Sequence, residues 1–87
     1  MSDSTEEVER GRAMAERAVR ELCQAQGRKQ PRLEWGPVTD TPQRVEILIS
    51  DLDPIEIEFS IPLLKAQGGI GAARLARQAL TNALRSR

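Results

Sequence analysis

The stretch that decides the fold is RVEILISDLDPIEIEFS, residues 44–60. Apolar residues take every second position on both sides of its central SDLDP, and glutamates stand between them. Because the side chains of a strand point alternately to opposite faces, this period of two predicts strands with one apolar face and one acidic face. The link from Asp51 to Pro54 is short, so we expect residues 44–50 and 55–60 to pair antiparallel.

A shorter strand precedes these two. Leu33 and Trp35 alternate with Arg32 and Glu34, which predicts a first strand over residues 32–35. The segment 36–43 contains two prolines and reads as a loop rather than as a tight turn.

Helical patterns flank the strands. Ser4 and Glu7 match a capping box, and Gly27 followed by Pro31 ends the helix that begins there. Its apolar stripe recurs at every third and fourth residue and is rich in small side chains: Val8, Gly11, Ala15, Ala18, Val19 and Leu22. We therefore expect this helix to lie close against its neighbour.

The last third of the chain is predicted to be helical with a break. Ser60 can cap a short helix that tolerates Pro62 in its first turn. Two adjacent glycines cost about 2 kcal/mol inside a helix, so we expect a break at Gly68-Gly69 before a final helix over residues 71–85.

The predicted fold class is therefore α+β. Helix, three-stranded antiparallel sheet and helix make a two-layer sandwich, with the helices on one face of the sheet. A chain of 87 residues forms a single α-β-β-β-α domain, 1–87, in which we expect residues 1–3 and 86–87 to be frayed. A core this small favours sharing area with a second copy, so we expect a homodimer.

The charges cancel overall but are unevenly distributed. The chain has 13 acidic and 13 basic side chains, so there is no net field to attract nucleic acid or a membrane. Five acidic and no basic residues lie from Glu46 to Glu58, whereas five basic and no acidic residues follow Glu58. This predicts a dipolar molecule with an acidic sheet and a basic last helix.

Several chemistries are disfavoured by composition. The chain has no His and no Tyr, which removes the commonest general base and metal ligand. Its lone Cys23 excludes an internal disulfide, suits a reducing cytosol and is expected to be buried, with Arg20 as the evident neighbouring cation. We expect no enzyme activity, cofactor or metal.

The pattern predicts neither a secretory signal nor a membrane span. The first nine residues are acidic and lack an apolar run, and no segment has the roughly 20 apolar residues of a membrane span. We expect a soluble, cytoplasmic protein.

The cluster Asp40, Asp51 and Asp53 lacks the spacing of a calcium loop, and we interpret these residues as turn formers.

One segment carries a candidate mechanism, QGGIGAAR at residues 67–74. Glycines ahead of a helix allow backbone amides to approach an anion at the positive end of the helix dipole. The candidate contacts to phosphate or nucleic acid are Lys65, Gly69, Gly71, Arg74 and Arg77. The alternative is a plain break between helices. The spacing from Gly68 to Gly71 also resembles the GxxG loop of KH domains, without the strand that follows it there.

The order of elements, with glycine and then arginine at the start of the last helix, resembles that of double-stranded RNA-binding domains. In those domains the basic start of the second helix meets the RNA backbone. Ala72 and Ala73 stand here in place of their lysine pair, and the chain has no loop histidine. The resemblance is therefore one of topology and assigns no family.

The expected function is that of a small, non-enzymatic binding or adaptor module that acts through protein contact as a homodimer. The apolar residues that are hardest to bury within one chain are the candidate protein contacts: Trp35, Leu48, Leu52 and Ile70. The open sheet edges can also accept a strand from a partner. The alternative is binding of an RNA or DNA backbone through the glycine-rich loop and the last helix.

Overall fold

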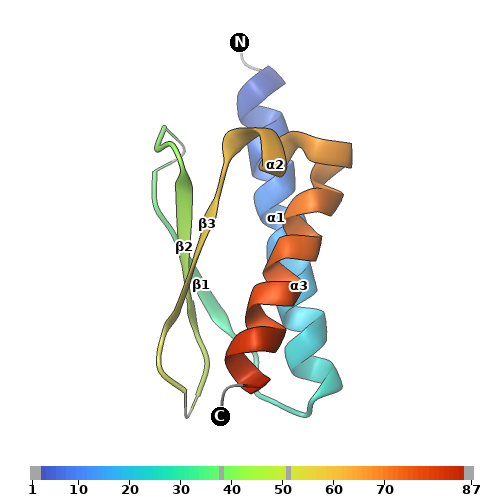
Figure 1. Cartoon of the computed structure of the whole chain (residues 1–87), viewed down its shortest axis with the longest axis vertical. Coiled ribbons are helices and arrows are strands. Elements are labelled where there is room, and N and C mark those ends of the chain that lie inside the picture. Colours follow the sequence, from blue (N-terminus) through green and yellow to red (C-terminus); the bar gives the residue numbers. More distant parts are fainter. Residues whose placement is uncertain (1–2, 38, 51, 86–87) are drawn as a thin grey trace.

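The computed structural model describes residues 3–37, 39–50 and 52–85, and the side chains of residues 3 and 4 lie outside the description. The elements follow the predicted order, and the α+β fold class is confirmed (Figure 1). They are α1 (Asp3–Ala25), β1 (Arg32–Trp35), β2 (Gln43–Leu48), β3 (Ile55–Phe59), α2 (Ile61–Lys65), the 3-10 turn η1 (Ala66–Gly69) and α3 (Ile70–Arg85).

The three strands form an antiparallel sheet in the order β1-β2-β3. In this register Val45 of β2 lies between Trp35 and Ile57, and the next residue, Glu46, lies between Glu34 and Glu56. Both long helices stand on the same side of the sheet (Figure 1). The sheet therefore has an inner face under the helices and an outer face that no described helix covers.

The period of two in the sequence reappears as burial. Val45, Ile47, Ile57 and Phe59 are almost fully buried on the inner face, and the glutamates between them are exposed. The helices contribute small and branched side chains to the same core: Val8, Ala15, Val19 and Cys23 from α1, Leu64 from α2, and Ala72, Ala76 and Leu80 from α3. The described elements thus share one apolar core.

The two long helices begin at the same end of the molecule and run side by side in the same direction (Figure 1). Alanines line the side of each helix that is buried. At Gly11 a Cβ atom would overlap the backbone of Leu64 in α2. The small-residue stripe therefore allows α1 to lie close to its neighbours, as predicted.

The predicted break between the last helices is confirmed. The Ser60 hydroxyl accepts a hydrogen bond from the Leu63 amide at 3.3 Å and begins α2. Gln67 and Gly68 take left-handed backbone angles (φ 52° and 66°), and α3 starts at Ile70. Glycine at position 68 adopts such angles without the penalty that a side chain brings.

At the other end of the chain, α1 begins at Asp3, one residue before the predicted Ser4 cap. Fraying is predicted for residues 1–3 and 86–87. Residues 1–2 and 86–87 lie outside the described residues, as does the side chain of Ser4, and Asp3 belongs to α1. None of the helices in the described part of the chain combines the length and the apolar character of a membrane span.

Candidate functional site

The outer face of the sheet carries a row of three glutamates. Glu34, Glu46 and Glu56 lie directly opposite one another on β1, β2 and β3, and all three are exposed. Opposed residues of an antiparallel pair have Cβ atoms about 4.5–5.5 Å apart, and like charges there are destabilising. The row therefore concentrates negative charge at the centre of this face.

Two arginines share the face, so it is less acidic than the sequence pattern predicts. Arg44 Nε lies 3.1 Å from Glu58 Oε2, and Arg32 Nε lies 3.4 Å from Glu34 Oε2. Both arginines precede residues 46–58, the range in which the sequence is acidic, but the register places them on the same face of the sheet as Glu46. Among the described residues, no ion pair forms at Glu46 or Glu56.

Of the four candidate protein contacts, two lie against the core. Trp35 and Leu52 are partly buried and pack on the core residues. Leu48 is half-buried on the outer face, opposite Arg32, and Ile70 is 46% exposed at the start of α3. Because β2 ends at the opposite end of the molecule from the start of α3, Leu48 and Ile70 do not form one patch (Figure 1).

Trp35 is held by a polar network that links the β1–β2 hairpin to α1. Its indole Nε1–H donates to Glu16 Oε2 at 2.7 Å, and the guanidinium of Arg12 lies over its ring, 4.7 Å from the centroid. Arg12 also donates from Nε to Gln43 Oε1 at 2.7 Å and from Nη2 to the Gly36 carbonyl at 2.8 Å. These bonds fasten the hairpin to the helix.

Burial lowers the pKa of Arg12, and the carboxylates of Glu9, Asp40 and Glu16 oppose that shift. The guanidinium stays charged because its reference pKa lies far above neutrality. The buried side chain of Gln43 completes the network by donating from Nε2 to the Asp40 carbonyl at 3.3 Å.

Sequence reasoning missed this network, although one signal was present. Gln43 falls in phase with Val45 and Ile47, so alternation places a polar amide on the inner face. A buried amide needs partners, which is the cue that a long side chain of α1 would reach it.

The glycine-rich segment is used for packing. Gly69 is buried, and a Cβ there would come within 2.7 Å of the Met14 side chain; at Gly71 it would come within 3.1 Å of Leu63. The Ile70 amide donates to the carbonyls of Ala66 and Gln67 instead of facing outward. These contacts favour the interpretation of this segment as a break between helices over that of an anion cradle.

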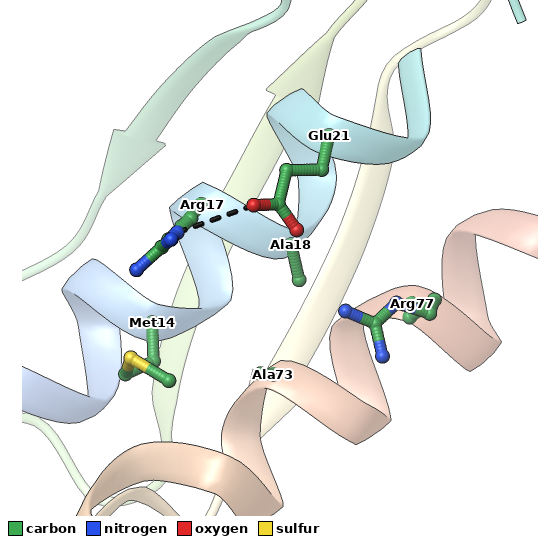
Figure 2. A pocket seen from close by; sticks show the side chains of 6 residues that line it. All are labelled: Met14, Arg17, Ala18, Glu21, Ala73 and Arg77. Atoms are coloured by element: carbon green, nitrogen blue, oxygen red, sulfur yellow. Dashed lines mark hydrogen bonds and ion pairs between the residues drawn. The ribbon is translucent and has the colours of Figure 1, made fainter. Parts of the chain in front are cut away.

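The three cations predicted near this segment lie on the helices that flank it, Lys65 on α2 and the two arginines on α3. Lys65 Nζ is 3.8 Å from Glu7 Oε1. Arg74 and Arg77 are exposed on α3 and form no ion pair with a described acid. Figure 2 shows Arg77 across a shallow groove of about 180 Å³ from Arg17 and Glu21 of α1, which pair with each other at 3.2 Å. The side chains of Met14, Ala18 and Ala73 also line this groove.

The remaining candidates for chemistry are dispersed. Cys23 is 1% exposed, and burial raises the pKa of its thiol, with Arg28 rather than Arg20 as the neighbouring cation. Arg20 instead lies 3.5 Å from Glu16. Asp40 and Asp53 sit in loops at opposite ends of the sheet, and Asp51 lies outside the described residues. No three His, Cys, Asp or Glu side chains in the described ranges are placed to hold a metal ion.

A scan of protein-family models, a search of curated proteins and a search of solved structures each found no match to this chain.

Proposed function

We propose that this chain is a small, non-enzymatic protein-binding module that presents the outer face of its sheet to a basic segment of a partner protein. The observation that carries the proposal is the pair of exposed, opposed carboxylates of Glu46 and Glu56, which have no ion-pair partner among the described residues. We further infer a cytoplasmic location, which the single buried thiol of Cys23 supports.

Two features of the face favour a protein ligand. A partner arginine placed between Glu46 and Glu56 would form charge-assisted hydrogen bonds and remove the repulsion between them. Leu48, half-buried on the same face, adds an apolar contact beside the charges. Polar contacts of this kind set orientation and specificity, and apolar contacts add affinity.

The test uses a synthetic peptide that alternates arginine and valine, titrated into the protein by calorimetry at near-physiological salt. We expect the double variant Glu46→Gln/Glu56→Gln to bind at least about tenfold more weakly, which is 1.4 kcal/mol. The matched control is Glu21→Gln, which removes an exposed carboxylate from α1 instead. Equal weakening by the control would refute the outer face as the binding site.

A second candidate function follows from α3. Its charged residues are all cations, and Arg74 and Arg77 are exposed without an acidic partner in the described part of the chain. Such side chains can contact the phosphates of RNA or DNA. A gel shift at low salt with duplex RNA and DNA tests this function. Binding that is unchanged in Arg74→Ala/Arg77→Ala would exclude it.

A further inference from the structure

One hydrogen-bonding edge of the strand β1 is paired with no other strand among the described residues. This strand is an outer strand of the sheet and pairs with β2. The Gly36 amide donates to the Arg44 carbonyl at 3.0 Å, which places the backbone groups of Gly36, Glu34 and Arg32 on the side of β2. Because these groups alternate along a strand, Leu33 and Trp35 direct their N–H and C=O groups to the free edge.

These free groups restrict how a second copy can add to β1. Opposed residues of an antiparallel pair share a face, so a two-fold pairing of β1 with itself has few registers. When the two-fold axis lies at Arg32 or at Glu34, that residue faces the same residue of the second copy, so like charges are opposed. Centred on Leu33, the pairing places Arg32 of each copy opposite Glu34 of the other. That register alone among the three is complementary in charge.

The other outer strand resists the same pairing. In β3 the alternation directs the backbone groups of Glu56 and Glu58 to the free edge. The two-fold antiparallel registers of β3 with itself that are centred on Glu56, Ile57 or Glu58 each set glutamate opposite glutamate, and such like-charge pairs disfavour pairing at a sheet edge. Pairing of β1 with β3 of a second copy would set Leu33 beside Glu56. The apolar inner face of one sheet would then continue into the charged outer face of the other.

We infer that the chain forms a homodimer through antiparallel pairing of β1 with β1 of a second copy, centred on Leu33. The two three-stranded sheets then join into one. Leu33 and Trp35 are half-buried at this edge, so the pairing covers apolar side chains that a single copy leaves partly open. The inference deepens the proposed function, because it makes the outer faces of the two copies continuous.

Sedimentation velocity from about 5 µM to about 500 µM tests the dimer. Leu33→Pro removes the outward N–H, which proline tolerates at a sheet edge, and leaves the pairing of β1 with β2 in place. We expect this variant to be monomeric with an unchanged far-ultraviolet circular dichroism spectrum. The control Leu33→Ala keeps the N–H and should retain measurable dimer. Dimerisation of Leu33→Pro equal to that of the wild type would overturn the inference.

Charge reversal tests the register. Arg32→Glu alone sets glutamate opposite glutamate, and Glu34→Arg alone sets arginine opposite arginine, so each should weaken the dimer about tenfold or more. An equimolar mixture of the two variants should restore it as a heterodimer with complementary charges at both positions. A monomeric wild type, or single reversals that leave the dimer unaffected, would overturn the inference.

The two proposals fail separately. A monomer that binds the arginine–valine peptide through Glu46 and Glu56 would overturn the dimer and leave the proposed function standing. A dimer through β1 that does not bind the peptide would overturn the proposed ligand of the outer face and leave the dimer standing.

Discussion

Replacing Glu46 by glutamine is predicted to stabilise the isolated protein. Glu46 is the centre of the row and has a glutamate directly opposite it on each side. Two carboxylates about 6 Å apart in water repel by about 0.7 kcal/mol, and physiological salt roughly halves this value. Two neighbours therefore predict a gain of up to about 0.7 kcal/mol in the free energy of unfolding, because Arg32 offsets part of the charge of Glu34. Glu56→Gln loses one neighbour and should gain about half as much.

Glu58→Gln is the matched control, because it makes the same substitution on the same face of β3. Its carboxylate lies 3.1 Å from Arg44, so its removal should lower the free energy of unfolding by up to about 1 kcal/mol. Urea denaturation followed by circular dichroism measures all three variants. The expected order of stability is Glu46→Gln, Glu56→Gln, wild type and then Glu58→Gln.

Salt supplies an independent check of this reasoning. Raising sodium chloride from about 20 mM to about 500 mM should shrink the advantage of Glu46→Gln, because screening removes the repulsion in the wild type. If Glu46→Gln is no more stable than the wild type at low salt, or if its advantage does not depend on salt, the carboxylates are not held opposite one another as described.

Three further predictions concern the interior. Arg12→Met should lower the free energy of unfolding by about 1–3 kcal/mol, because the buried Gln43 Oε1 loses that donor. The double variant Arg12→Met/Gln43→Leu should recover part of this loss. Strictly additive effects of the two substitutions in urea denaturation would contradict the hydrogen bond. Gly11→Ala should cost about 1–3 kcal/mol despite the better helix propensity of alanine, because its Cβ meets the backbone of Leu64; a raised melting temperature would argue against that contact. Burial raises the pKa of the Cys23 thiol, so its contribution to stability is complete below the pKa of the unfolded thiol and is lost as the pH rises from there through the pKa of the folded thiol. The melting temperature of the wild type should therefore fall more steeply with alkaline pH than that of Cys23→Ala. Equal slopes of melting temperature against pH would refute this prediction.

The elements that the sequence predicted well are those set by local periodicity. Val45 and Ile47 are buried and Glu46 is exposed because alternation in a strand follows from backbone geometry alone. The break before α3 was equally accessible, since adjacent glycines disfavour a continuous helix in any context. Such signals need no knowledge of what lies across the fold.

The features that the sequence did not predict depend on contacts between distant residues. Arg12 and Gln43 are 31 positions apart, and their bond requires the orientation of α1 over the hairpin. Likewise, the sequence around Gly69 and Gly71 is compatible with an anion-binding loop. The packing of α1 and α2 against these glycines favours a break between helices instead. The register of the strands also depends on distant residues. It places Arg44 opposite Glu58 and Glu46 between two glutamates.

The register of the strands also favours the sheet, rather than the helices, as the binding surface. The buried polar groups at the junction of α1 and the hairpin are bonded within the chain, and the glycine-rich segment is explained by packing. Three features are left unsatisfied by one copy: the opposed charges of Glu46 and Glu56, the half-covered Leu48, and the free edge beside Leu33. Sequences are locally consistent with their folds except where function requires otherwise. Because all three exceptions lie on one small sheet, a partner protein that covers its outer face and a second copy that pairs with its edge would resolve them together.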